Sequence, residues 1–364
     1  MLIGIDASRA VLPQRTGTEN YSLHLIRHLL ALGGGHRYRL YFNNAPEPEF
    51  FPAGAELKVM PFPRLWTHLR LSWEMARQRP DLLFIPAHIL PLIHPKRSVV
   101  TVHDLGYLHY PQSHRTLDRL YLDLSTRYNA LAAGHLIAVS QATKRDLVER
   151  YGVQDEKITV IYSGRDESLH PLEDKGAIAA VKRRYGIEGD YILYLGTLHP
   201  RKNLVRLIEA YQIVRRSGRE EKLVIAGKKG WLYKEIFRRV EELNLKGWVL
   251  FPGYVEQESM AALFSGARLF VLPSLYEGFG LPILEAMSCG TPVVCAGVSA
   301  LPEVAGDAAL LVDPLDVEEM AEAMRRALED ESLRAGLREM GLRRARSFSW
   351  EKCARETLAV LERE

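Results

Sequence analysis

The alternation of short apolar runs with longer amphipathic segments constrains the fold of this 364-residue chain more than any other feature. Seven strand-like runs fall in the first half, at Leu2–Asp6, Tyr38–Phe42, Leu57–Met60, Leu82–Phe84, Ser98–Val102, Leu136–Val139 and Ile158–Tyr162. Segments with helical periodicity lie between them, notably at Asn20–Leu32, Leu65–Arg77, Leu117–Ala133 and Lys144–Tyr151. Such an alternation predicts a parallel sheet with helices on both faces.

A second set of strand-like runs occupies the other half of the chain. It comprises Tyr191–Leu195, Leu223–Ala226, Val249–Phe251, Leu269–Leu272, Val293–Cys295 and Ala309–Val312. The polar, acidic segment Ser163–Gly176 separates the two sets and is expected to be a linker. The tail is expected to form helices at Val317–Leu328, Leu333–Ala345 and Trp350–Glu364. The chain is too long for one ordinary core and suits two domains of about 170 residues each. We therefore expect an α/β protein with two doubly wound parallel-sheet domains.

Charge and composition exclude some classes of protein. With 47% hydrophobic and 26% charged residues and a net charge of +3, the chain has an ordinary globular composition, which argues against a dedicated nucleic-acid-binding protein. Residues 1–165 hold 20 Lys and Arg against 14 Asp and Glu, whereas the remainder holds 28 against 31. The basic first half either offers a surface to an anionic acceptor or a membrane, or is an uninformative scatter of charge.

Cysteine usage and hydropathy indicate the compartment. Cys289, Cys295 and Cys353 lack C-x-x-C spacing, so neither a disulfide framework nor a zinc cluster is predicted. The amino-terminal run Met1–Asp6 reaches an acid too soon for a signal peptide. The longest apolar stretch, residues 82–93, is interrupted by prolines and a histidine, so it cannot span a bilayer. We expect a cytoplasmic protein, either free or peripheral on the inner face of the membrane.

Two carboxylates flank a glycine-rich bend in the segment Glu277-Gly-Phe-Gly-Leu-Pro-Ile-Leu-Glu285. Glu277 follows the strand-like run Leu269–Leu272, and Glu285 lies in a helix that begins near Pro282. In an open parallel sheet, ligands bind at the carboxyl ends of the strands. The two acids are therefore candidate acceptors of ribose and hexose hydroxyls, although two solvated acids at a helix entry would have the same spacing.

Six segments, in this order along the chain, resemble the retaining GT-B glycosyltransferases of family 4. They are residues 101–105, 139–144, 194–203, 251–254, 273–287, and 290–294 together with 301–303. The resemblance covers nearly the whole chain. It implies a GT-B fold of two Rossmann-like domains that face a central cleft. Residues 1–165 would bind the acceptor and residues 177–347 the nucleotide-sugar donor, while the final helix 348–364 would cross back onto the first domain.

The resemblance assigns the donor diphosphate to a cationic loop. A diphosphate leaving group develops negative charge that the enzyme must neutralise. Arg201 and Lys202 would neutralise it, with Gly196 and Thr197 beside them and Lys228 as a further cation. Many family members carry arginine at the position of Thr197, so here Arg201 supplies the second cation. Two exposed basic residues before a helix are the alternative interpretation.

The resemblance assigns the rest of the donor to the glycine-rich bend. Glu285 would bind the ribose hydroxyls, whereas Glu277 and the backbone of Phe279, Gly280 and Leu281 would bind the hexose.

Four residues of the first domain receive roles in the same way. His103 would contact the transferring sugar, with Asp104 on the acceptor side; the alternative is a structural imidazole held by Asp104. Gly17, in the loop Thr16–Glu19, would let the backbone approach the donor phosphate or the acceptor, unless the loop is a simple turn. Ser140 would either face the acceptor or cap the helix that follows it.

Several motifs do not occur in the chain. It contains no D-x-D triplet, no H-E-x-x-H and no other metal-ligand spacing, so arginine and lysine are expected to take the place of a metal ion. No cofactor is expected, because the nucleotide sugar is a substrate. The chain also lacks a P-loop, and Gly278-Phe-Gly280 lacks the third glycine of a dinucleotide fingerprint, so ATPase and dehydrogenase functions are not supported.

The basic segment Pro63–Pro80 has two interpretations. Its apolar residues Leu65, Leu69, Trp73 and Ala76 share one helical stripe among arginines. An ordinary core-facing helix explains this pattern and is the favoured interpretation. The alternative is a surface that presents Trp66 and the arginines to a membrane or to a lipid-linked acceptor.

Together these features predict a retaining hexosyltransferase. Residues 195–203 and 274–280 most resemble bacterial mannosyltransferases of polysaccharide assembly, so GDP-mannose is the first donor and UDP-linked hexoses are the second. The acceptor would be a saccharide or a lipid-linked saccharide. A nucleotide-sugar isomerase on the same scaffold is an alternative from a different class. A catalytically silent partner subunit is disfavoured, because both acids and both phosphate cations are present.

Overall fold

The chain divides into two compact units. The computed structural model covers residues 1–364 and describes all of them except 13–16, 48–49, 52–53, 88 and 114. Unit 1 comprises Met1–Gly164 and Phe348–Glu364, and unit 2 comprises Arg165–Ser347.

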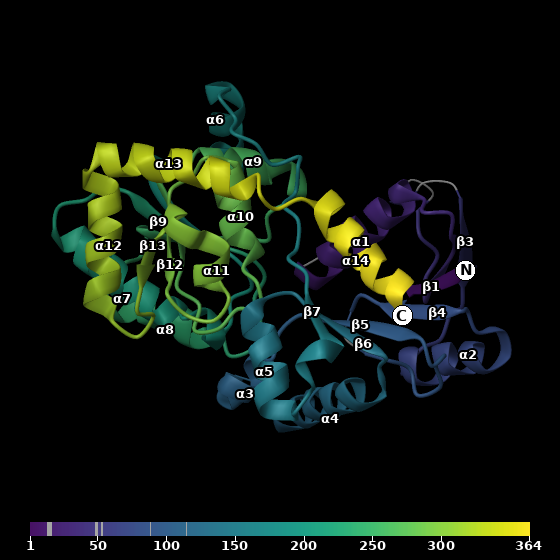
Figure 1. Ribbon diagram of the computed structural model, residues 1–364. Coiled ribbons are helices and arrows are strands. Elements are labelled where there is room, and N and C mark those ends of the chain that lie inside the picture. The colour runs from purple at the N-terminus through teal and green to yellow at the C-terminus, as the bar shows by residue number, and fades with distance from the viewer. Residues whose placement is uncertain (13–16, 48–49, 52–53, 88, 114) are drawn as a thin grey trace. The chain divides into compact units, whose positions relative to one another are not determined.

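A seven-stranded sheet forms the centre of unit 1, in the order β3-β2-β1-β4-β5-β6-β7, and all its pairs are parallel (Figure 1). The strands are β1 (Leu2–Asp6), β2 (Arg37–Phe42), β3 (Ala55–Val59), β4 (Leu82–Ile85), β5 (Ser98–Val102), β6 (His135–Ala138) and β7 (Ile158–Val160). Every residue of β4, β5 and β6 is buried, as in a sheet that is covered on both faces. The strand order reverses between β1 and β4, so the topological switch point lies there.

The helices of unit 1 come from both ends of the chain. They are α1 (Gly17–Leu32), α2 (Ser72–Gln78), α3 (Gly106–His109), α4 (Thr116–Ala132), α5 (Gln141–Tyr151) and α14 (Trp350–Arg363). The yellow α14 lies against the purple α1 in Figure 1. Trp350 is 2% exposed and stacks on His24 with ring centroids 5.3 Å apart, and it meets Tyr21 edge-on at 5.7 Å. This aromatic contact ties the last helix of the chain to the first.

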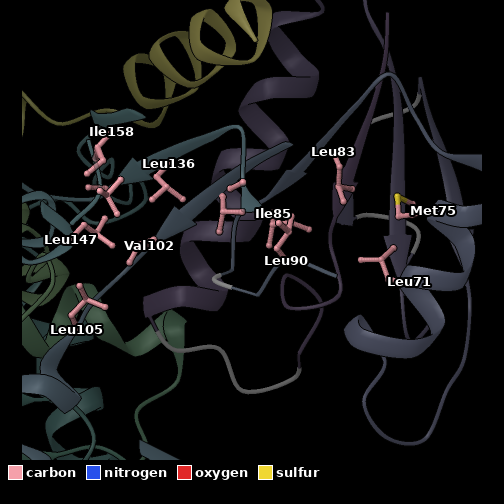
Figure 2. Close-up of a cluster of buried hydrophobic side chains, with 14 of the residues drawn as sticks. Leu71, Met75, Leu83, Ile85, Leu90, Val102, Leu105, Leu136, Leu147 and Ile158 are labelled. Carbon is pink, nitrogen blue, oxygen red and sulfur yellow. The ribbon is translucent and has the colours of Figure 1, made fainter. Parts of the chain in front are cut away.

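Apolar side chains from the sheet and the helices form one core cluster in unit 1 (Figure 2). Leu83, Ile85 and Val102 point from the strands toward this cluster. Leu71, just before α2, and Met75, within α2, belong to the same cluster and lie at one end of it in Figure 2. The buried face of α2 is thereby fixed by the sheet.

Unit 2 repeats the same architecture with six parallel strands in the order β10-β9-β8-β11-β12-β13. The strands are β8 (Tyr191–Leu195), β9 (Lys222–Ala226), β10 (Val249–Gly253), β11 (Leu269–Leu272), β12 (Val293–Ala296) and β13 (Leu310–Val312). The helices are α6 (Lys175–Arg184), α7 (Leu204–Arg216), α8 (Lys234–Glu242), α9 (Gln257–Ser265), α10 (Leu281–Ser288), α11 (Leu301–Ala305), α12 (Val317–Glu329) and α13 (Glu331–Ala345). The order reverses between β8 and β11, which brings the loops after these two strands together.

The predicted fold class is confirmed, since both sheets are parallel and doubly wound. The chain passes from unit 1 to unit 2 inside the segment expected to be a linker, Ser163–Gly176, between Gly164 and Arg165. This segment, which the structure describes throughout, has no helix or strand before α6, which begins at Lys175. Within the described residues, no helix has both the length and the apolar character needed to cross a bilayer.

The segment Leu65–Arg77, which was expected to be a single helix, is divided in the structure. It consists of a π-helical turn, Thr67–Leu71, followed by α2. The favoured core-facing interpretation of its apolar stripe is wrong, because Leu69 and Trp73 are 50% and 58% exposed. The alternative placed Trp66 at the surface, but this side chain is 7% exposed and its Nε1 donates to the carbonyl of Met60 at 2.8 Å.

Replacing Trp350 by alanine is expected to destabilise unit 1 by about 3–5 kcal/mol, because a large buried ring is removed between α14 and α1. Urea unfolding monitored by circular dichroism measures this loss. Glu351→Ala is the matched control, since the adjacent side chain is 61% exposed and should change the free energy of unfolding by less than about 0.5 kcal/mol. Equal stability of the two variants would contradict the role of this contact.

Candidate functional site

The loop between β8 and α7 carries the two cations that the sequence singled out. His199 caps the short 3-10 turn Pro200–Lys202, because its Nδ1 accepts from the backbone N–H of Arg201 at 3.1 Å. Asn203 closes the turn in the left-handed conformation, with φ of 60°. Asparagine tolerates this conformation better than most residues do. The turn therefore holds Arg201 and Lys202 at the carboxyl end of β8.

Asn203 ties this loop to the neighbouring strand β11. Its side-chain amide is buried and donates to the carbonyl of Pro273 at 3.1 Å and to that of Pro314 at 2.6 Å. The backbone N–H of Leu275 also donates to the carbonyl of Arg201 at 2.9 Å. The two loops at the switch point of unit 2 are thus bonded to each other.

The junction brings Arg201, Lys202 and Glu277 together. Lys202 Nζ lies 2.5 Å from Glu277 Oε1, and Arg201 Nη1 lies 3.8 Å from Glu277 Oε2. Arg201 Nη1 also donates to the carbonyl of Tyr276 at 2.5 Å. Burial alone would raise the pKa of Glu277, but attraction to Lys202 and Arg201 outweighs it and holds that pKa below its ordinary value. The group is one carboxylate between two cations, so it keeps a net positive charge.

The bend after Glu277 leads directly into α10. Gly280 precedes the helix with φ of 104°, and a Cβ there would come within 2.6 Å of Leu301. Only glycine fits this position. Phe279 and Leu281 flank it, so the three residues assigned to the hexose lie at the amino terminus of α10. The positive end of a helix dipole favours anionic or strongly polar ligands.

Glu285 lies on α10, in a setting different from that of Glu277. Burial raises the pKa of Glu285 to about 7, and the negative charge of Asp166 adds to the effect. Asp166 itself accepts from Gln257 Nε2 at 2.6 Å. Glu285 is therefore a carboxyl group that changes its protonation state near neutral pH. Asp166 was not among the predicted site residues, because its segment was expected to be a linker.

The loops after β8 and β9 touch at two glycines. Gly227 has φ of 140°, and a Cβ there would lie 1.9 Å from the carbonyl oxygen of Gly196. The contact continues beyond the glycines, since Leu198 N–H donates to the carbonyl of Lys228 at 2.8 Å. The ammonium group of Lys228 lies 5.1 Å from the ring centre of Tyr254, at the end of β10. Lys228 therefore belongs to the same sheet edge as Gly196 and the adjoining Thr197.

In unit 1, His103 lies at the carboxyl end of β5. Its Nε2 bonds to the carbonyl of Pro86 at 2.7 Å, and its ring meets Tyr21 edge-on at 4.7 Å. Burial lowers the pKa of His103, although Pro86, Asp104 and Glu19 act in the opposite direction. Because a carbonyl oxygen only accepts, Nε2 carries the proton and Nδ1 of the neutral ring is an acceptor.

The other predicted site residues of unit 1 lie in separate surroundings. Asp104 Oδ1 accepts from the backbone N–H of Gly106 at 2.9 Å, so the bond that orients His103 comes from Pro86 and not from Asp104. Ser140 is fully buried and caps α5, since its Oγ accepts from the N–H of Thr143 at 3.0 Å.

Gly17 is the first residue of α1 and is exposed. Thr16, with which the predicted glycine loop starts, lies outside the described residues.

The structure adds three residues that the sequence motifs did not indicate as functional. Tyr276 and Ser299 bracket Glu277: the Tyr276 carbonyl accepts from Arg201, and Ser299 Oγ accepts from the Glu277 N–H at 2.9 Å. Pro86 fixes the protonated nitrogen of His103. Only strand order could have revealed these partners. A cluster of three or more His, Cys, Asp or Glu side chains suited to a metal ion does not occur among the residues that the structure describes.

Comparisons with known proteins cover both units. Residues 180–344 match the family model of glycosyl transferases group 1, and residues 15–169 match that of Glycosyltransferase Family 4. The chain is 33% identical over 296 residues to O-antigen chain mannosyltransferase B of Escherichia coli, which covers 81% of this chain and 77% of that protein. It is 31% identical over 226 residues to the serotype-specific mannosyltransferase WbdA of Escherichia coli, over 61% of this chain but only 28% of that protein. Sucrose-phosphate synthase from Thermosynechococcus elongatus has the same fold, with a TM-score of 0.78 at 21% identity, over 100% of this chain and 98% of that one.

The raised pKa of Glu285 predicts a pH-dependent stability. A carboxyl group whose pKa rises from 4.5 to about 7 on folding stabilises the protein below pH about 4.5, and this stability is lost as the pH rises through 7. Glu285→Gln removes the cost of burying the charge. The free energy of unfolding of the variant should therefore exceed that of the parent by up to about 3 kcal/mol at pH 8. The two values should be equal at pH 4.

Thermal and urea unfolding at pH 4, 6 and 8 tests this expectation. Glu167→Gln, an exposed acid in the same unit, is the control and should give no such trend. A difference between Glu285→Gln and the parent that does not vary with pH would show that the folded protein does not hold this carboxyl in its protonated form.

Proposed function

Since this chain belongs to the group 1 and family 4 glycosyltransferases, we propose that it transfers a mannosyl group from GDP-mannose to an acceptor hydroxyl with retention of anomeric configuration. The acceptor is a growing O-antigen or a related saccharide, free or lipid-linked. The identity of 33% to an O-antigen mannosyltransferase over most of both chains supports the choice of sugar and acceptor class.

The observation that carries the proposal is the cluster of Arg201, Lys202 and Glu277 at the switch point of unit 2. Two cations held by a capped turn can receive the two phosphates of a nucleotide sugar. Their charge is positioned before the reaction, so it needs no reorganisation when negative charge develops on the leaving oxygen. The same two side chains supply what a divalent ion supplies in other transferases, and the reaction is proposed to need no metal.

We assign the two carboxylates to different parts of the donor. Glu277 keeps its charge beside the cations, and we assign it to the hexose hydroxyls together with the backbone of Phe279–Leu281. Glu285 is assigned to the ribose hydroxyls. A carboxylate accepts hydrogen bonds from both hydroxyls of a ribose, so nucleotide binding draws Glu285 toward its ionised form.

The transfer step breaks the bond between the anomeric carbon and the phosphate oxygen and forms a bond between that carbon and the acceptor oxygen. In a front-face departure, the proton of the acceptor hydroxyl moves to the leaving phosphate oxygen. The products are the glycosylated acceptor and GDP. His103 is assigned to the transferring hexose, where its unprotonated Nδ1 accepts a hydrogen bond from a sugar hydroxyl.

A donor screen tests the proposed function. The chain is incubated with GDP-mannose or UDP-linked hexoses, with and without a lipid-linked saccharide acceptor and in the presence of EDTA, and the released nucleoside diphosphate and the sugar products are identified. We expect acceptor-dependent release of GDP that EDTA does not stop. Release from UDP-hexoses alone would correct the donor, and an altered sugar still joined to its nucleotide would identify an isomerase instead.

Lys202→Ala is expected to lower turnover by about 10²–10³, since one preorganised charge on the diphosphate is lost. Initial rates of GDP release measure this. Lys222→Ala is the matched control, because Lys222 pairs with Glu188 at the amino end of β9, the opposite edge of the sheet from the site. Lys222→Ala should keep the parent's rate. Equal rates for the two variants would remove Lys202 from the diphosphate site.

A further inference from the structure

Helix α4 buries polar residues and exposes most of its leucines. Its buried residues are polar: Ser125, Thr126 and Asn129 are 7%, 0% and 1% exposed. Hydrogen bonds satisfy two of them, since Thr126 Oγ1 accepts from Tyr107 at 2.8 Å and Asn129 Oδ1 accepts from the N–H of Leu90 at 3.1 Å. The core thus contacts α4 through these polar residues and, in part, through Leu122 and Tyr128, whereas the leucines of the opposite face stay exposed.

The outward side of α4 is a row of leucines. Leu117, Leu124 and Leu131 recur every seven residues and are 79%, 56% and 82% exposed. Leu120 lies between the first two and is 53% exposed. Residues seven apart share one helix face. Solitary exposed leucines need no explanation, but a continuous apolar row along a helix indicates a binding surface.

A second exposed apolar row lies beside the first. Leu65, Leu69 and Trp73, in and around the π-helical turn and α2, are 60%, 50% and 58% exposed. His68 Nε2 bonds to the hydroxyl of Tyr121 on α4 at 2.9 Å, so the two elements are in contact.

The loop residues Leu92 and Ile93, 59% and 51% exposed, extend the same area. The hydroxyl of Tyr128 on α4 donates to the carbonyl of Leu92 at 3.1 Å, and Ile93 N–H donates to Ser72 of α2 at 3.3 Å. We call the exposed apolar side chains of these three segments the α2–α4 surface.

The three segments that carry the α2–α4 surface are rich in positive charge. Residues 64–79, 91–97 and 115–131 together hold nine Lys and Arg against three Asp and Glu. Two of the three acids are already paired: Glu74 is buried between Lys58 and Arg70, and Asp123 bonds to Arg127 at 2.9 Å. Eight of the nine cations are exposed, on the same three segments as the exposed apolar side chains.

We propose that the α2–α4 surface binds the anionic face of a lipid bilayer, with the leucines of α4 among the acyl chains and the arginines among the headgroups. An amphipathic helix with an apolar row and neighbouring basic residues binds such an interface in two ways. Its apolar side chains are buried among the acyl chains, and its basic side chains are attracted to anionic headgroups. A second copy of the chain fits less well, because two such surfaces would bring their basic residues together. The proposal does not depend on the sugar donor, since it rests on unit 1 alone.

Vesicle binding by the full chain tests the proposal. Vesicles of equal parts phosphatidylglycerol and phosphatidylethanolamine should sediment the protein at about 0.05 M NaCl, whereas phosphatidylcholine vesicles should sediment far less. Binding should weaken at about 0.5 M NaCl, where the attraction of exposed charges is screened. Leu117→Ser with Leu124→Ser should reduce the partition constant at least tenfold, at roughly 25 cal/mol for each Å² of apolar area kept in water.

Charge is tested with Arg64→Gln, Arg77→Gln and Arg119→Gln combined, which should reduce binding to anionic vesicles about tenfold or more. Arg70 is left in place because it pairs with buried Glu74.

The controls remove equal numbers of exposed side chains from unit 2. Leu232→Ser with Leu315→Ser matches the leucine variant, since these residues are 62% and 59% exposed, and Arg183, Arg216 and Arg343 changed to Gln match the arginine variant. Circular dichroism and melting temperature verify that each variant is folded.

Two results would overturn the proposal. One is that the parent does not bind anionic vesicles at low salt, or that both surface variants bind as well as their controls. The other is that sedimentation velocity finds a dimer for the parent and a monomer for the leucine variant, while neither protein binds vesicles. The α2–α4 surface would then be an interface between copies of the chain.

Discussion

Both sheets of this protein are built from parallel strands alone. In a parallel sheet all strands end at the same side, so the loops that follow them gather there. In unit 2 the order reverses between β8 and β11, which makes the loops after these two strands neighbours. The charged site forms at that point. Arg201 and Lys202 come from one loop and Glu277 from the other, and Asn203 bonds the loops together.

The two acids of the glycine-rich bend show how burial acts on charge. Glu277 and Glu285 are eight residues apart, yet the pKa of the first is lowered and that of the second is raised to about 7. The difference lies in their neighbours, two cations for Glu277 and the anion Asp166 for Glu285. Burial penalises a charge unless an opposite charge compensates it. One bend thus provides a carboxylate whose pKa is lowered and a carboxyl group whose pKa is raised to about 7.

Unit 1 uses its helices in two different ways. α14 returns from the far end of the chain and buries Trp350 against Tyr21 and His24, and Tyr21 in turn meets His103 edge-on. The last helix therefore supports the residues around His103. α4, in contrast, is bound to the core by hydrogen bonds of its buried polar residues, and its leucines are exposed. The core of unit 1 forms without these leucines, so they remain at the surface.

The fold class and the residue types of the site could be predicted from the order of the amino acids. Apolar runs located every strand to within a few residues, and β1, β5, β8 and β11 have the bounds that were predicted, because strands buried on both faces leave continuous apolar runs. The motifs also named Arg201, Lys202 and Glu277 one by one. Their adjacency was not in the sequence, since β9 and β10 separate β8 from β11 along the chain and only the hydrogen bonding of the sheet makes them neighbours.

The buried side of the segment at residues 65–77 could not be predicted in this way, because it depends on contacts within the folded unit. The periodicity of residues 65–77 revealed an apolar stripe and suggested the core as its partner, but the sheet instead packs against Trp66, Leu71 and Met75. Both sides of this segment are apolar, so periodicity identifies the two faces but does not show which of them is buried. Contacts with Leu83 and other residues distant along the chain determine the buried face, and such contacts form only when the whole unit folds.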